Sequence, residues 1–187
     1  MSDFLFQKKT KKFQLVIESI DTLCEIEKSS LKNSIKNKRK KEIIAKEKLI
    51  KKLFPDEQLS YSKFGAPQLS NGNAISLSHS KELFAVITAE KVASVDIEPI
   101  DKKAFRLKNK FLDNVELNFI KHHETATLLW CAKECLYKLH QRGNINFKQH
   151  LKICQLSNNH IECSLLNKIY FLKYKKINKH WLVYYFD

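Results

Sequence analysis

The 187-residue sequence contains little glycine, proline or arginine, with only three residues of each. Glycine-rich loops of the Walker A and GxGxxG types are missing, and so is an HExxH zinc motif, so the chain lacks the sequence signals of the nucleotide-binding and metalloprotease classes. No serine lies in a G-x-S-x-G elbow, which argues against a hydrolase with a catalytic triad. Any chemistry therefore has to come from other residues.

The five cysteines are odd in number and never spaced as CxxC. This pattern favours reduced thiols over a disulfide framework or a zinc knuckle. No apolar run approaches the length of a membrane span, and the N-terminus lacks the charged-then-apolar pattern of a signal peptide. We therefore expect a cytoplasmic protein that does not enter a membrane.

Positive charge and a substantial apolar fraction are what the chain does have. The formal net charge is +14, and hydrophobic residues make up 43% of the sequence. The apolar content is enough for a core in one domain or in two small packed lobes. The basic surface favours anionic partners, which include nucleic acid, a phosphate-bearing small molecule and an acidic protein.

Hydrophobic periodicity predicts strands and helices in both halves of the chain. The expected strands are residues 13–20, 74–77, 83–89, 92–97, 151–156, 160–165, 169–175 and 180–186. The expected helices are residues 30–54, 101–110, a stretch from 114, and 124–141. Each half then combines strands with one major helix, so we predict an α+β fold whose halves could be similar lobes.

Two carboxylates, Asp96 and Glu98, stand two residues apart in the expected strand 92–97. Both side chains project from one face of the strand, while Val95 and Ile97 point toward a core. Neighbouring carboxylates repel each other unless a proton or a cation lies between them, and oxygen ligands of this kind suit Mg²⁺. An exposed strand edge is an equal alternative for these two residues.

The helix around Trp130 divides into two faces at about 100° per residue. The apolar face contains Leu128, Ala132, Cys135, Leu136 and Leu139, and the polar face contains Trp130, Lys133, Glu134, Tyr137 and Lys138. Glu134 and Lys138 are four residues apart and could form a simple exposed ion pair. Two large aromatic residues on the polar face indicate instead that a neighbouring lobe or a ligand covers it.

Two further segments are candidates for binding phosphate. Residues 76–80 (SLSHS) form a strand that runs into a polar turn, whose hydroxyl groups, backbone N–H groups and histidine could hold a phosphate. The basic run 36–41 (KNKRKK) should be mostly solvated, with one or two members that grip a phosphate. The longer segment 36–52 could alternatively bind nucleic acid, with a steep salt dependence.

Five segments resemble, in order and spacing, elements of the 4′-phosphopantetheinyl transferase family of the surfactin-synthetase-activating type. The segments are Gly65–Leu69 (GAPQL, similar to GKPxL), Ile75–Ser80 (ISLSHS, similar to ISxSHS), Val95–Glu98 (VDIE, similar to G-(V/I)-D-(I/V)-E), Phe111–Glu116 (FLDNVE, similar to F-(F/L)-x-x-x-E) and Trp130–Lys138 (WCAKECLYK, similar to WxxKE(A/S)xxK). The similarity covers roughly residues 30–150.

The resemblance implies two similar α/β lobes in a pseudo-twofold arrangement, residues 1–93 and 94–187, with the active site in the cleft between them. It implies transfer of the phosphopantetheine arm of coenzyme A to a serine of an acidic acyl or peptidyl carrier protein, with release of adenosine 3′,5′-bisphosphate. A monomer without nucleic-acid or membrane partners is expected.

The resemblance also assigns roles to individual residues. It implies that Asp96, Glu98 and Glu134 hold Mg²⁺, with Mn²⁺ as an option, and that Glu134 or Glu116 is the base. The residues it implies for contact with coenzyme A are Lys38, Lys48, Gly65, Ser78, His79 and Lys138.

Three positions depart from the family pattern: Ser94 replaces a glycine, Ala66 replaces a lysine, and Glu47 stands where a basic residue is common, with Lys48 beside it. These departures leave a second hypothesis open, a degenerate member of the family that binds carrier protein or coenzyme A without catalysis. A basic nucleic-acid-binding protein is the third hypothesis.

Overall fold

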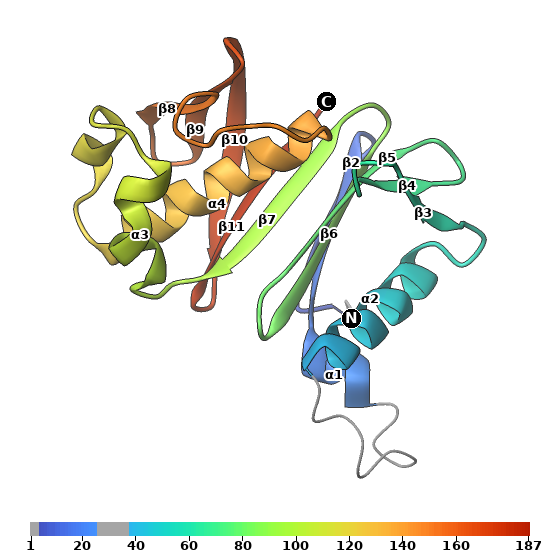
Figure 1. The fold of residues 1–187 in the computed structure, drawn as a ribbon. Coiled ribbons are helices and arrows are strands. Elements are labelled where there is room, and N and C mark those ends of the chain that lie inside the picture. Colours follow the sequence, from blue (N-terminus) through green and yellow to red (C-terminus); the bar gives the residue numbers. More distant parts are fainter. Residues whose placement is uncertain (1–3, 26–37) are drawn as a thin grey trace.

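Two antiparallel sheets stand next to each other in the computed structural model, which describes residues 4–25 and 38–187 (Figure 1). The first sheet has the strand order β1-β2-β6-β5. Its strands are β1 (Phe6–Lys9), β2 (Phe13–Ser19), β5 (Ala74–His79) and β6 (Leu83–Ala89). Strand β6 (LFAVITA) is apolar almost throughout because both of its faces are buried.

Two helices cover one face of the first sheet, α1 (Ile20–Glu25) and α2 (Lys38–Leu53). Ala45 and Leu49 of α2 pack against Phe84 and Val86 of β6. The opposite face of β6 packs against the second sheet. A short hairpin of β3 (Leu59–Tyr61) and β4 (Pro67–Leu69) follows α2, and its turn places Gly65 at a φ of 81°, which L side chains rarely adopt.

The second sheet has the order β7-β11-β10-β9-β8. Its strands are β7 (Ala93–Pro99), β8 (Leu151–Leu156), β9 (His160–Leu165), β10 (Lys168–Ile177) and β11 (His180–Phe186). The long helix α4 (His123–His140) lies across this sheet in Figure 1. Helix α3 (Lys103–Phe111) and the short 3-10 helix η1 (Glu116–Phe119) connect β7 to α4.

Strands β5 and β7 belong to different sheets but run side by side. Three serine hydroxyls connect the two sheets, and we call them the serine seam: Ser76 and Ser78 of β5, and Ser80 directly after it. Ser76 Oγ accepts the Val95 N–H at 3.1 Å, and Ser78 Oγ accepts the Ile97 N–H at 3.3 Å. Ser80 Oγ lies 3.0 Å from Nε2 of the buried His180. Alternate residues of β5 thus link the two sheets, because side chains two apart share one face of a strand.

The predicted α+β class is confirmed, and most of the predicted strands and helices are present with shifts of a few residues at their ends. Strand β1 and helix α1 were not predicted. The predicted helix 30–54 is observed from Lys38, and residues 30–37 lie outside the described part of the chain. The pseudo-twofold relation and the boundary between residues 93 and 94 stay predictions.

The helices that the structure describes include none that is both long and apolar enough to cross a membrane.

Candidate active site

Three carboxylates come from two elements that pack together: Asp96 and Glu98 from β7, and Glu134 from α4. The alternation of β7 explains the arrangement, because Val95 and Ile97 are fully buried in the core between the sheets and the acidic side chains project toward α4. Ser94 lies inside β7 in extended backbone and donates its hydroxyl to the Cys135 carbonyl at 2.7 Å. The serine that replaces a glycine therefore fastens β7 to α4.

Asp96 is 3% exposed, and only one of its two carboxylate oxygens has strong hydrogen-bond donors. Its Oδ1 accepts hydrogen bonds from Ser78 Oγ at 2.7 Å and from Lys138 Nζ at 2.8 Å. Its Oδ2 is buried, and among the described residues no strong donor reaches it. The Cys131 thiol, which lies close to Asp96, is only a weak donor. Unsatisfied carboxylate oxygens are rare in protein interiors.

Glu98 and Glu134 both resist ionisation at this site. Burial, followed by the charge of Asp96, raises the pKa of Glu98 to about 7. Burial and then Asp96 also raise the pKa of Glu134 to about 7. Each carboxylate thus makes the next one harder to ionise, and a cation among the three would remove that penalty.

Lys138 is turned toward β7. Its ammonium donates to Asp96 Oδ1 and, at 3.0 Å, to the Val95 carbonyl. The simple exposed ion pair with Glu134 is thus replaced, within the described residues, by a contact with a buried carboxylate. Burial alone would lower the pKa of Lys138, but the Asp96 charge raises it above its usual value, so Lys138 is a cation.

The donor chemistry fits a hard divalent cation, since it offers three carboxyl groups and one buried oxygen without a good partner. The three side chains do not form a ready-made metal site as they stand. Within residues 4–25 and 38–187, no group of three His, Cys, Asp or Glu side chains could already hold a metal ion.

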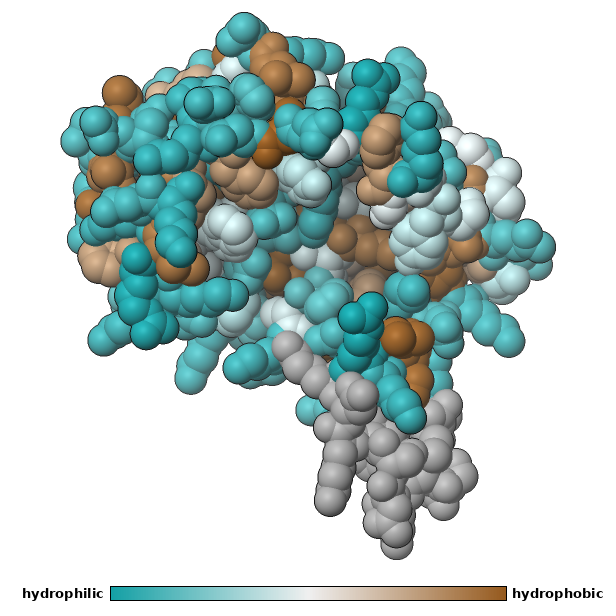
Figure 2. All heavy atoms as spheres, in the orientation of Figure 1, coloured by the Kyte–Doolittle hydropathy of each residue, from teal (hydrophilic) through white to brown (hydrophobic). Residues whose placement is uncertain are grey.

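A pocket of about 720 Å³ opens beside Lys138. Its walls come from both halves of the chain: α2, the β3–β4 hairpin, β5 and the C-terminal end of α4. Figure 2 shows a hollow in this region, with apolar residues at its floor and hydrophilic residues around it. The volume is in the range of small-molecule and cofactor sites. The basic and histidine side chains on its walls are Arg39, Lys46, His79, Lys138 and Arg142.

A smaller pocket of about 380 Å³ lies on the other side of His79, which lines both pockets. Glu98 and Trp130 line this second pocket, together with the basic residues Lys81 and Lys103. Lys138 therefore faces the first pocket and Glu98 faces the second.

The residues expected to contact coenzyme A are distributed unevenly. Gly65, His79 and Lys138 line the larger pocket, whereas the Ser78 hydroxyl is directed to Asp96 and Ile97. Lys48 points about 200° away from Lys46 on α2, and it is Lys46 that lines the pocket. The side chain of Lys38 lies outside what the structure describes.

Arg39 belongs to the basic run 36–41 that was expected to supply one or two phosphate contacts, and Lys46 is a pocket residue that no phosphate expectation included. Their spacing of seven residues, two helical turns, puts them on one face of α2. A wheel calculation applied to this helix would have selected them.

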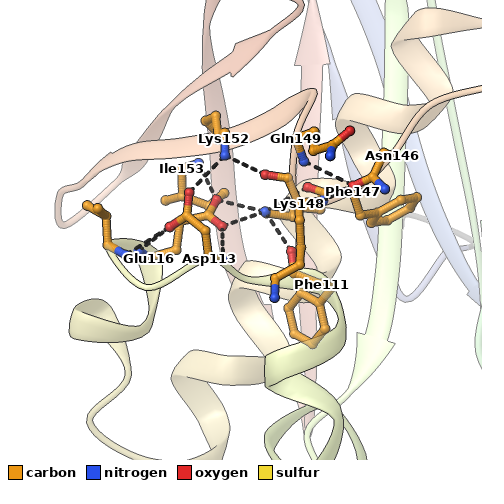
Figure 3. A network of polar contacts seen from close by, with 11 residues as sticks. Phe111, Asp113, Glu116, Asn146, Phe147, Lys148, Gln149, Lys152 and Ile153 are labelled. Carbon is orange, nitrogen blue, oxygen red and sulfur yellow. Dashed lines mark hydrogen bonds and ion pairs between the residues drawn. The ribbon is translucent and has the colours of Figure 1, made fainter.

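Glu116 occupies a different environment from the other carboxylates. It is 1% exposed, and its carboxylate lies 2.7 Å from Lys133 Nζ. The same carboxylate accepts the backbone N–H groups of Asp113 and Ile153, both at 2.8 Å (Figure 3). Both oxygens of Glu116 thus already accept hydrogen bonds from other groups of the protein.

The wheel calculation placed Lys133 on the polar face, opposite the apolar one, yet Lys133 is fully buried. Its ammonium donates to Glu116 and to the carbonyls of Phe111 and Phe147, at 2.8 and 2.9 Å. A helix wheel ranks side chains by polarity, so it cannot anticipate a charge whose three donors all find partners. Trp130 is covered by Phe111 and Phe147, which belong to the same half of the chain and not to a neighbouring lobe or a ligand, while Tyr137 is 38% exposed.

Part of the chain is similar to a known protein family. Residues 94–184 match the family model of the 4′-phosphopantetheinyl transferase superfamily. The matched region contains Asp96, Glu98, Glu134 and Lys138, and it ends before the last residues of β11. No curated protein matches the chain.

Proposed function

We propose that the chain is a 4′-phosphopantetheinyl transferase of the surfactin-synthetase-activating type. It transfers the 4′-phosphopantetheine arm of coenzyme A to a serine of an apo acyl or peptidyl carrier protein and releases adenosine 3′,5′-bisphosphate. The observation that carries the proposal is that the region matching the superfamily includes all three carboxylates and Lys138. The coenzyme A segments of the resemblance, Gly65–Leu69 and Ile75–Ser80, lie outside this region and help to line the adjoining pocket.

The larger pocket takes the nucleotide part of coenzyme A. Its basic residues come from opposite walls, Arg39 and Lys46 from α2 and Arg142 from the segment after α4. Cationic groups on two walls can neutralise the phosphates of one donor molecule. Lys138, which lines the same pocket next to Asp96, carries its charge to the pyrophosphate.

Asp96, Glu98 and Glu134 would hold Mg²⁺, or Mn²⁺ in its place. When bound, the cation supplies positive charge that stabilises the phosphoryl oxygens in the transition state. The orphaned Oδ2 of Asp96 and the raised pKa values of its two neighbours support this assignment.

Glu134 is the base that we propose for the incoming serine hydroxyl. The serine oxygen attacks phosphorus, the bond to the bridging pyrophosphate oxygen breaks, and the serine proton passes to the carboxylate. A proton acceptor must be ionised, and a bound cation would lower the pKa of Glu134 from the value of about 7 that it has without one, so that Glu134 is a carboxylate near neutral pH. Glu116, the other candidate, has its oxygens engaged by Lys133, Asp113 and Ile153, which supports Glu134 over Glu116.

The positive net charge of the chain, +14, suits both coenzyme A and an acidic carrier protein. The proposal includes action as a monomer in the cytoplasm.

The test is incubation of the purified protein with coenzyme A, Mg²⁺ and several apo carrier proteins, followed by intact mass measurement of each carrier. The wild type should add one phosphopantetheine mass to at least one carrier. Glu134→Gln should lose this activity, while Glu124→Gln, an exposed position on the same helix that pairs with Lys176, should retain it. Binding of coenzyme A without any mass gain would instead identify a degenerate member of the family.

A further inference from the structure

Trp130 is held in a slot between two phenylalanine rings. The Phe111 ring meets it edge-on at 5.0 Å, and the Phe147 ring stacks on it at 5.5 Å. The two phenylalanines come from separate segments, the end of α3 and the loop after α4. Such a slot restricts the indole to one orientation.

A single buried ammonium fixes both walls of the slot. Lys133 Nζ donates to the backbone carbonyls of Phe111 and Phe147, and its third hydrogen bond goes to Glu116. Figure 3 shows Phe111, Phe147 and Glu116 around this point of the network. Because every donor of the ammonium is used, neither phenylalanine backbone can move without the loss of a buried hydrogen bond.

The orientation of the indole has a consequence on β7. Trp130 Nε1 donates to Glu98 Oε1 at 3.0 Å. This bond fixes the rotation of the Glu98 carboxyl group and leaves Oε2 as the oxygen for another ligand. A glutamate side chain has three rotatable bonds, so its orientation would otherwise be lost to rotamer entropy.

We propose that Trp130 is a positioning residue, which aims the Glu98 carboxylate at a divalent cation. The inference rests on the proposed function. Lys133 and Glu116 serve as the anchor behind it, through Phe111 and Phe147. Trp130 itself need not touch the cation. Hydrogen-bond partners that orient a ligating residue typically change metal affinity by about 10- to 100-fold when they are removed.

Trp130→Phe keeps an aromatic ring in the slot and removes the N–H donor together with the five-membered ring that carries it, so a second tryptophan-to-phenylalanine variant has to serve as the packing control. The probe is Mn²⁺, titrated into the purified full-length protein in the absence of coenzyme A. Free Mn²⁺ is measured by electron paramagnetic resonance. We expect Trp130→Phe to weaken Mn²⁺ binding by about 10-fold or more, with a melting temperature in the absence of metal within a few degrees of the wild type.

Trp181→Phe is the matched control, since its indole N–H donates to the Glu124 carbonyl on the outer part of α4. It should leave Mn²⁺ affinity unchanged. A double-mutant cycle with Glu98→Gln supplies a readout that packing would not move: once Glu98 is changed, Trp130→Phe should have little further effect on affinity.

The outcomes are distinguishable. Equal Mn²⁺ affinity of Trp130→Phe and the wild type overturns the positioning role and leaves the proposed function intact. Additive losses in the double mutant also overturn it, because they show that Trp130 acts independently of Glu98. A wild type that binds no Mn²⁺, with or without coenzyme A, overturns both the metal-dependent function and this inference.

Discussion

Helix α4 carries two lysine–carboxylate pairs five residues apart, and they differ in how completely their hydrogen bonds are satisfied. In the first pair, Lys133 and Glu116, both side chains are almost fully buried and every donor of the ammonium has a partner. In the second pair, Lys138 and Asp96, the lysine is 26% exposed and one oxygen of Asp96 lacks a good partner.

This difference in hydrogen bonding distinguishes a pair that holds the fold together from a pair that has room for a ligand. A buried ion pair whose lone pairs and protons are all satisfied holds its elements in place, and removal of either partner leaves a buried charge. An incomplete pair beside two carboxylates with raised pKa values has room for a ligand. A lysine–carboxylate pair therefore anchors α4 at Lys133, whereas the pair at Lys138, near the C-terminal end of α4, has room for a ligand.

Lys133→Met should cause the largest loss of stability in this comparison. It leaves the Glu116 carboxylate buried without its cation, and such a change typically costs about 3–5 kcal/mol. Urea unfolding followed by circular dichroism would measure it. The double variant Lys133→Met/Glu116→Leu should recover most of the loss, because no buried charge remains. A loss below about 1 kcal/mol in the single variant would contradict the anchor role.

Lys138→Met should have a smaller effect on stability, about 1–3 kcal/mol, because Asp96 keeps the Ser78 hydroxyl as a donor. Removal of the cation should also make the site more dependent on metal, so Mg²⁺ should raise the melting temperature of this variant more than that of the wild type. Lys176→Met, at an exposed pair on the outer face, is the control and should change little. An equal response to Mg²⁺ in all three proteins would argue against a cation among the carboxylates.

The sequence indicated the pair that we propose to be functional better than the anchoring one. The alternation of β7 and the spacing of Glu134 and Lys138 selected the residues that meet beside the pocket, because these signals depend on local periodicity. Lys133 escaped the same reasoning, since its partners come from segments 14 to 22 residues away in the chain. The links from Ser78 to Asp96 and from Trp130 to Glu98 could not be predicted for the same reason, as they join elements that only the tertiary fold brings together.

The pH dependence of stability should report on the two carboxylates beside the Lys138–Asp96 pair. The folded protein without divalent cations holds the pKa of Glu98 and of Glu134 at about 7, above the ordinary glutamate value of 4.5. The folded state therefore binds more protons than the unfolded state between these values, so this contribution to stability is full below about pH 4.5 and is lost as pH rises through 7. Urea unfolding in a chelator from pH 5 to 8 should show the decline, and Glu98→Gln should reduce it. The same decline in Glu98→Gln/Glu134→Gln would assign it to other groups.

Ser76→Ala should have the smallest effect, about 1 kcal/mol, since it leaves only the Val95 N–H without its acceptor. Ser76 borders the larger pocket but forms no hydrogen bond with the carboxylates of either pair within the described residues, so transfer activity should fall far less than in Glu134→Gln. Ser60→Ala on the exposed strand β3 is the matched control. A loss of activity without a loss of stability would show that the seam affects the site directly.

The serine seam also makes the fold sensitive to insertions and deletions in strand β5. The hydroxyls of Ser76, Ser78 and Ser80 are directed to the second sheet, and the alternate residues Ile75, Leu77 and His79 line the larger pocket, which Ser76 also borders. A single inserted or deleted residue after the Gly72 turn would exchange the two sets at once, because a shift of one residue turns every side chain of a strand to the other face. Apolar groups would then meet the N–H groups of β7, and hydroxyls would line the pocket floor. Single substitutions in β5 can be accommodated one bond at a time, but a change in its length would disrupt the seam and the pocket together.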